Sequence, residues 1–385
     1  MKNQPRVLFP LDLSRERPVG PLFGYYHPET QTANVLSCGV PPERPRTFAP
    51  PIHLGWLGPW GGETQIQPRL EGRYDGDHLL FKLDHTPCKV EFYSLVQEVF
   101  SRNKGILEVS RMLDKGVLIM ACGSVGSLLA LELARAGVGR FLLVDPDTLE
   151  YHNLCRHQCS LTDVGRYKVE ALKDRILDIN PAAQVRVEKV VIQRLPKEVF
   201  DDFLRPGTLI LASGDNREAD LYANRISCLY KVPFLSIGLW ERAFAGEVFY
   251  SLPGKTPCYK CLCDSIGFTQ SRVTENRRLY TTRENLEEVT FEPGISTDLS
   301  LVTLVGTRMA YDLLEGTDKI LRHFTPYTLW CNSLDPNVGG EMVEIFTHPF
   351  QITRSIEIRK TEGCPHCRIV GAALEETGSG AGPEE

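Results

Sequence analysis

Residues 115–168 read KGVLIMACGSVGSLLALELARAGVGRFLLVDPDTLEYHNLCRHQCSLTDVGRYK, and this stretch decides the fold of the chain. It opens with an apolar run ending in a glycine, residues 116–123, which is typical of a strand buried on both faces of a parallel sheet. Apolar residues at helical spacing follow over 124–137, and a second apolar run over 140–144 ends at Asp145. The pattern predicts an α/β fold, with a Rossmann-like mixed sheet covered by helices on both faces.

The turn between the first strand and its helix carries Ala121-x-Gly123-x-x-Gly126, an imperfect G-x-G-x-x-G motif. Small residues there let a phosphate approach backbone N–H groups at the positive end of a helix. Asp145 follows about twenty residues later, where a carboxylate can accept a hydrogen bond from a ribose hydroxyl. Because the motif is short, a chance match and another nucleotide-binding fold stay open as alternatives.

A polar cluster follows Asp145 and consists of Asn153, Arg156 and Lys168. A bound dinucleotide has little use for these side chains, whereas a triphosphate attacked at its α-phosphorus needs cations there. Taken singly, each could be a solvated surface residue. Their joint spacing favours a site for a nucleoside triphosphate.

The polar cluster and four later segments together resemble the ThiF/MoeB family, whose fold ubiquitin-activating enzymes share. The resemblance extends over about residues 101–367. The later segments are a helix closed by Asn180-Pro181, a strand from Thr208 that ends at Asp215-Asn216, and the pairs Cys258-Tyr-Lys-Cys261 and Cys364-Pro-His-Cys367.

This resemblance implies a catalytic site for adenylation with ATP and Mg²⁺. Asp145 would hold the ribose, while Asn153, Arg156 and Lys168 would bind the triphosphate and stabilise charge at the α-phosphorus. Asp215 would carry Mg²⁺, which prefers hard oxygen ligands. A turn-forming aspartate is the alternative interpretation of Asp215.

Members of this family also take an arginine from the partner subunit of a homodimer. That arginine lies just before the first strand of the nucleotide-binding unit. Arg102 stands at the matching position and is the candidate for this catalytic role. We therefore expect a homodimer.

The chain contains twelve cysteines. It shows neither a charged and apolar N-terminal leader nor a run of about eighteen apolar residues. We therefore expect a cytoplasmic protein whose cysteines are thiols or metal ligands rather than disulfides.

Two Cys-x-x-Cys pairs fit the four thiolates of a tetrahedral, structural Zn²⁺ site. Cys263 and His366 lie close enough in the sequence to be alternative ligands. The predicted ligands are Cys258, Cys261, Cys364 and Cys367.

The typical acyl-accepting cysteine of ubiquitin-activating enzymes, on the crossover segment after the first zinc pair, has no counterpart here. Residues 265–329 contain no cysteine, and the polar segments 270–278 and 281–288 predict a mobile surface loop. This departure puts a thioester in doubt and leaves adenylation intact. Cys155, Cys159 and Cys263 are the alternative thiols. A helix is expected from Leu299 to Leu314, with Ser296 or Thr297 as its cap.

At 385 residues the chain is long enough for a large core and a smaller domain. Residues 1–95 are rich in proline, glycine and aromatic residues, which predicts a small, mostly β domain for substrate recognition or dimerisation. The MccB-like enzymes similarly place a small recognition domain first and lack the crossover cysteine. Residues 96–367 would form the adenylation domain, and residues 368–385 a disordered tail.

The net charge of −6 and the lack of basic runs argue against nucleic acid or an anionic membrane as partner. We expect ATP-dependent adenylation of the C-terminal carboxylate of a ubiquitin-like or sulfur-carrier protein ending in glycine. Pyrophosphate would be released, and a conjugating enzyme could act next. The alternatives are an MccB-like enzyme acting on a ribosomal peptide, an NAD-dependent oxidoreductase, and a catalytically inactive scaffold.

Overall fold

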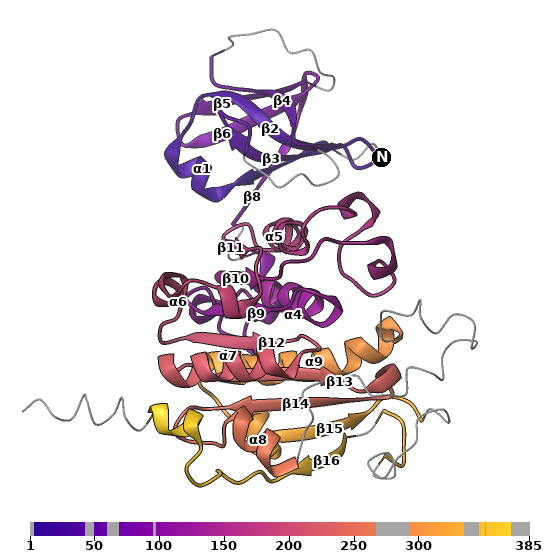
Figure 1. The fold of residues 1–385 in the computed structure, drawn as a ribbon. Coiled ribbons are helices and arrows are strands. Elements are labelled where there is room, and N and C mark those ends of the chain that lie inside the picture. The colour runs from indigo at the N-terminus through magenta and orange to yellow at the C-terminus, as the bar shows by residue number, and fades with distance from the viewer. Residues whose placement is uncertain are drawn as a thin grey trace, which may run out of the picture. The chain divides into compact units, whose positions relative to one another are not determined.

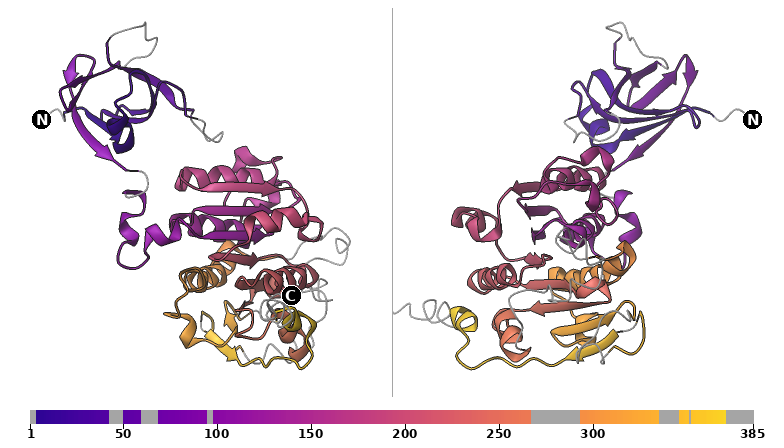
Figure 2. Two further views of the ribbon diagram at one scale, coloured as in Figure 1. Left: turned by 90° about the vertical axis from the view of Figure 1, so that its left-hand side faces the viewer. Right: turned by 45° about the vertical axis from the view of Figure 1, so that its right-hand side comes forward.

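The computed structural model describes residues 4–42, 50–59, 69–94, 98–266, 293–334, 346–350 and 352–370. The chain divides into two compact units, residues 1–106 with 177–182 and residues 107–176 with 183–385 (Figures 1 and 2). Residues 365–370 are helical and Val370 is buried, whereas residues 371–385 of the predicted tail lie outside the described residues. No helix within the described ranges has the length and apolar character needed to cross a bilayer.

The first unit is built around an eight-stranded mixed sheet in the order β7-β6-β5-β4-β2-β3-β1-β8. Strand β6, His78–Leu83, buries every second residue, as expected of a strand with one face on the core. That core includes Phe9, Leu22 and Phe81. The predicted small, mostly β domain is confirmed. Its other elements are β1 Arg6–Pro10, α1 Leu11–Glu16, β2 Gly20–His27, β3 Thr32–Cys38, β4 Ile52–Leu57, β5 Leu70–Asp75, β7 Thr86–Pro87, β8 Lys89–Tyr93 and the 3-10 turn η1 Ser101–Asn103.

The second unit holds another eight-stranded mixed sheet, in the order β11-β10-β9-β12-β13-β14-β15-β16. The strands from β11 to β13 are parallel to their neighbours, and β14, β15 and β16 are antiparallel. The strands are β9 Gly116–Met120, β10 Arg140–Val144, β11 Gln184–Glu188, β12 Thr208–Ala212, β13 Phe234–Leu239, β14 Ala245–Ser251, β15 Tyr327–Cys331 and β16 Ile352–Ile356.

Helices cover both faces of this sheet (Figure 2). On one face α9 packs so closely that a Cβ added at Gly306 would lie 2.3 Å from Ile237 Cδ1. On the other face α6, α7 and α8 share one apolar core with Leu118 and Met120 of β9. The α/β, Rossmann-like fold is therefore confirmed. The helices are α3 Val109–Met112, α4 Ser124–Arg135, α5 Lys168–Ile179, α6 Lys197–Phe203, α7 Arg217–Tyr230, α8 Tyr259–Ile266 and α9 Ser296–Glu315.

Helix α9 differs at its start from the sequence expectation. Its N-cap is Ile295, whose side chain makes no capping hydrogen bond, and Ser296 is already helical. The predicted cap by Ser296 or Thr297 is therefore wrong, because the helix begins before either residue can cap it.

The carboxyl ends of three parallel strands lie level with one another. Met120 at the end of β9 pairs with Val144 of β10 and with Ala212 of β12. After β9 the chain first forms β10 on one side of it and later forms β12 on the other side, so the strand order reverses at β9. Such a reversal opens a crevice at the carboxyl ends of the strands, where α/β proteins bind ligands.

Candidate functional site

A cavity of about 430 Å³ lies at these strand ends. Its walls come from the segments that follow β9, β10, β12 and β13 and from the start of α9. Six of the residues predicted for the site line it together: Gly123, Asp145, Asn153, Arg156, Lys168 and Asp215.

Residues 121–123, named here the nucleotide turn, connect β9 to α4. Ala121 has a left-handed φ of 67°. The close approach of α4 to this turn depends on Gly126, because an added Cβ would lie only 2.0 Å from the Ala121 carbonyl O. A Cβ added at Gly123 would meet nothing within 4 Å. The two glycines therefore differ: Gly126 lets the helix pack, and Gly123 leaves open space beside the turn.

Asp145 closes the other side of the nucleotide turn. Its Oδ2 accepts a hydrogen bond from the Cys122 N–H at 2.7 Å, and its Oδ1 accepts from the Asp147 N–H at 2.8 Å. Burial raises the pKa of this carboxyl above its ordinary value. Each carboxylate oxygen has a further lone pair, so Asp145 can still accept from two ribose hydroxyls.

Residues 151–167, named here the cation loop, carry Asn153 and Arg156. The loop begins with the 3-10 turn η2, Tyr151–Asn153, in which the Glu150 N–H donates to Asn153 Oδ1 at 2.9 Å. This bond leaves the Asn153 side-chain amide as a donor at the cavity wall. A Cβ added at Gly294 would lie 3.7 Å from Arg156 Nη1, which places that guanidinium beside residue 294.

Lys168 begins α5 and points back to the end of β10. Its Nζ lies 2.8 Å from Asp147 Oδ2, and its side chain is only 12% exposed, against 62% for Asp147. An anion entering the cavity would therefore compete with Asp147 for this ammonium group. Asp147 follows Asp145 by two residues, and the sequence predicted no role for it.

Asp215 is exposed and follows β12. The next residue, Asn216, caps α7 by accepting from the N–H groups of Glu218 and Ala219. Cavity residues without a predicted role include Ser213, whose hydroxyl donates to the Ala121 carbonyl at 2.8 Å, and Trp240 with Glu241. Ser213 precedes the Asp-Asn pair and could have been found from it, whereas nothing local in the sequence marks Trp240.

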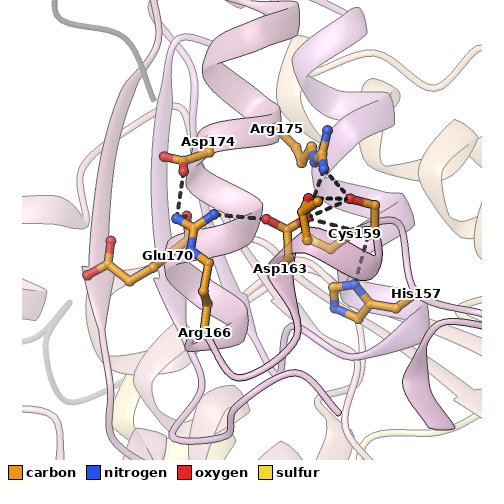
Figure 3. Close-up of polar contacts among 9 residues, drawn as sticks. His157, Cys159, Asp163, Arg166, Glu170, Asp174 and Arg175 are labelled. Atoms are coloured by element: carbon orange, nitrogen blue, oxygen red, sulfur yellow. Dashed lines mark hydrogen bonds and ion pairs between the residues drawn. The ribbon is translucent and has the colours of Figure 1, made fainter. Parts of the chain in front are cut away.

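The far end of the cation loop is anchored to α5 by an ion cluster (Figure 3). Asp163 accepts from Arg166 Nη1 at 2.9 Å and from Arg175 Nη2 at 2.8 Å. Arg166 also donates to Asp174 at 2.6 Å. Because Asp163 is 4% exposed, the loss of its charge would leave two cations without their shared partner.

The two predicted cysteine pairs come together at the apolar core that α6, α7 and α8 share with the sheet. All four Sγ atoms lie within 4.8 Å of one another, and among the described residues this group includes neither Cys263 nor His366. Three sulfur–sulfur distances are 3.5, 3.7 and 3.7 Å. The Thr361 N–H donates to Cys261 Sγ at 3.3 Å. His366 Nδ1 instead lies 3.4 Å from Asn224 Oδ1.

The remaining candidates lie elsewhere. Gly126 is on α4 beneath the nucleotide turn, and Arg102 is exposed on η1 within the first unit, so neither lines the cavity. Burial raises the pKa of the Cys159 and Cys263 thiols to about 12, which disfavours the reactive thiolate. Cys155 is exposed. The predicted loop segments 270–278 and 281–288 lie outside the described residues.

Comparison with known proteins identifies relatives of this chain. The model of the ThiF family matches residues 98–345. Ubiquitin-like modifier-activating enzyme 5 of Caenorhabditis elegans is 31% identical over 163 residues, which are 40% of this chain and 39% of that protein. Its namesake from Aedes aegypti is 28% identical over 230 residues, covering 57% of this chain and 53% of that protein. The chain thus spans about two fifths of the first relative and about half of the second.

A solved structure shares the fold. The crystal structure of E. coli MccB with ATP is 18% identical to this chain, with a TM-score of 0.50, covering 70% of this chain and 74% of that one.

Proposed function

Because the chain belongs to the ThiF family, we propose that it adenylates a C-terminal carboxylate with ATP and releases pyrophosphate. One observation carries this proposal. A single cavity joins Asp145, suited to a ribose, with the cations Arg156 and Lys168 and the carboxylate of Asp215. A dinucleotide site would not need that pair of cations.

In the proposed reaction a carboxylate oxygen of the substrate attacks the α-phosphorus of ATP. A new P–O bond forms, the bond to the oxygen bridging the α- and β-phosphorus breaks, and pyrophosphate leaves with that electron pair. Arg156 and Lys168 would stabilise the charge that spreads over the phosphate oxygens, and Asn153 would donate to them. The protein thereby contributes alignment and charge neutralisation.

Two metal ions belong to the proposal. A tetrahedral Zn²⁺ with bonds of about 2.3 Å needs sulfur atoms about 3.8 Å apart. Three of the sulfur–sulfur distances, 3.5 to 3.7 Å, are close to that value, and all four sulfur atoms lie within 4.8 Å of one another. This ion would tie the C-terminal segment to α8 without entering the chemistry. Asp215 offers the hard oxygen ligand that Mg²⁺ prefers, and the bound ion would neutralise phosphate charge.

The substrate that we favour is a ubiquitin-like protein ending in glycine, because the curated relatives are ubiquitin-like modifier-activating enzymes. The likeness to MccB concerns the fold alone, so a peptide substrate is the second arm of the test. A homodimer with Arg102 reaching the partner's site, a subsequent conjugating enzyme and a cytoplasmic location remain predictions.

ATP–pyrophosphate exchange tests the proposal directly. Purified chain, Mg²⁺-ATP and labelled pyrophosphate should give labelled ATP only when a glycine-terminated ubiquitin-like protein is added. Asp215→Ala should abolish exchange, and Glu218→Ala, an exposed acidic residue three positions later outside the cavity, should retain it.

Two outcomes would redirect the proposal. Exchange that depends on a short peptide with a free carboxylate, and not on the ubiquitin-like protein, would favour the MccB-like alternative. Exchange that survives Asp215→Ala would remove Asp215 from the reaction.

A further inference from the structure

We propose that His157 is a positioning residue that fastens the cation loop to the nucleotide turn and thereby sets Arg156 for ATP. This inference rests on the proposed function. His157 is only 6% exposed and is not among the residues that line the cavity, so it would act through its neighbours.

Two hydrogen bonds define the protonation of the His157 ring. Nδ1 accepts from the Cys159 N–H at 3.1 Å, which requires that nitrogen to be unprotonated (Figure 3). Nε2 lies 2.8 Å from the Cys122 carbonyl O and must then carry the proton that it donates. The geometry therefore fixes one neutral tautomer. Burial, which lowers the pKa of His157, agrees with it.

The backbone of Cys122 connects three parts of the site: the nucleotide turn, the cation loop and Asp145. Its carbonyl accepts from His157, while its N–H donates to Asp145, the candidate ribose ligand. His157 thus ties the cation loop to the residue whose N–H fixes Asp145. A shift of Cys122 would move the nucleotide turn and the ribose carboxylate together.

His157 also belongs to the same hydrogen-bonded turn as the cation. The N–H groups of Arg156 and His157 both donate to the Asn153 carbonyl, at 3.0 and 2.8 Å. Fixing the His157 ring therefore fixes the backbone that carries Arg156 and Asn153. The Asp163 cluster anchors the far end of the cation loop. The part beside Arg156 is tied to the nucleotide turn by the His157–Cys122 bond and to α4 by the Gln158 N–H, which donates to Ser127 Oγ at 3.3 Å.

Two replacements separate the two bonds of the ring. The terminal amide of glutamine can reach the position of Nε2 and donate to the Cys122 carbonyl. Asparagine reaches only the position of Nδ1 and leaves that carbonyl without its partner. If the Cys122 bond sets the site, His157→Asn should weaken Mg²⁺-ATP binding about tenfold, the loss expected for one such hydrogen bond. His157→Gln should restore binding to within about threefold of the wild type.

The experiment measures the dissociation constant of Mg²⁺-ATP by titration calorimetry on the full chain, with thermal unfolding of every variant. His323→Asn, an exposed histidine on the 3-10 turn Leu321–His323, is the matched control. The expected result is weaker ATP binding in His157→Asn, rescue in His157→Gln and no change in the control. Equal binding by the wild type and His157→Asn, or equal losses in both His157 variants, would overturn the role of His157.

Failure of the wild type to bind ATP would instead overturn the proposed function, and this inference with it. If His157→Asn does not fold, nitrogen-15 NMR of the wild-type imidazole decides the matter. The expected spectrum shows the neutral tautomer protonated at Nε2, with a resonance that shifts when ATP is added. A His157 ring that does not respond to ATP would refute the proposed link.

Discussion

Replacing Gly126 by alanine tests how the nucleotide turn is built. The added Cβ would lie 2.0 Å from the Ala121 carbonyl O and 2.8 Å from Ser213 Oγ. A Cβ is not tolerated within 3.0 Å of a backbone atom, so α4 and the turn must separate by about 1 Å. The serine can rotate away, whereas the carbonyl belongs to the turn itself.

The size of the effect follows from two opposing terms. Alanine is favoured over glycine inside a helix by about 1 kcal/mol, while overpacking costs about 1–3 kcal/mol. The free energy of unfolding should therefore fall by no more than about 2 kcal/mol. A misplacement of about 1 Å in a reacting group can lower the rate by about a hundredfold. Gly126→Ala should thus damage ATP–pyrophosphate exchange far more than folding.

Urea unfolding and ATP–pyrophosphate exchange kinetics on the same preparations measure the stability and the activity of the variant. Gly123→Ala is the contrasting variant, since its Cβ would enter open space and its φ of −75° suits any residue. It should unfold like the wild type and bind ATP less tightly. A Gly126→Ala variant with wild-type exchange and stability would refute the close approach between α4 and the turn.

Three further results are expected. Cys364→Ser should release zinc and lower the melting temperature by roughly 5–10 °C. Cys155→Ser, at an exposed thiol outside the cluster, should change neither the zinc content nor the melting temperature. Equal zinc content in the wild type and both variants would contradict the zinc site. Asp163→Asn should cost about 3 kcal/mol of stability at pH 7, because Arg166 and Arg175 lose the carboxylate that they share, while Arg166 retains Asp174. Burial acts to raise the pKa of Asp163, but hydrogen bonds from a backbone N–H and two arginines outweigh it and hold that pKa below its ordinary value. Its stabilisation is therefore present above pH of about 4 and lost as the pH falls further, so the gap between variant and wild type in acid unfolding should close there. Arg102→Ala and Asp215→Ala should each be inactive alone. In a mixed dimer one site combines an intact Arg102 with an intact Asp215, so refolding the two variants together should recover about a quarter of the exchange activity. No recovery on mixing would argue against an arginine supplied by the partner.

Local sequence patterns predicted much of this structure. The apolar runs that became β9 and β10, the helical spacing of α4 and the acidic strand end are short-range features, which side-chain periodicity encodes directly. Asp145, Asn153, Arg156 and Lys168 also lie within one contiguous stretch of the sequence. These residues could therefore be assigned to one site before any strand order was known.

Contacts between distant segments could not be obtained in that way. Asp215 lines the same cavity as Gly123 only because β12 pairs with β9 in register, and a pairing between distant strands leaves no local sequence signal. The same holds for Cys258 and Cys364, which are 106 positions apart and whose sulfur atoms lie 3.5 Å from each other. Family resemblance supported the expectation for Asp215, and the two Cys-x-x-Cys spacings supported the expectation for the cysteines.

His157 shows the difference between what local sequence patterns predict and what contacts between distant segments decide. In the sequence it is a histidine beside the candidate arginine Arg156, equally compatible with a ligand, a proton carrier or a surface residue. Its bond to the Cys122 carbonyl spans 35 positions and exists because the cation loop folds back over the nucleotide turn. The sequence by itself determined the order along the chain of the predicted polar groups, from Asp145 to Lys168 and then Asp215. Only the tertiary structure decided which other residues join them and that Cys122 ties Asp145 to the cation loop, because a hydrogen bond depends on the position and direction of two groups that the chain brings together only when it folds.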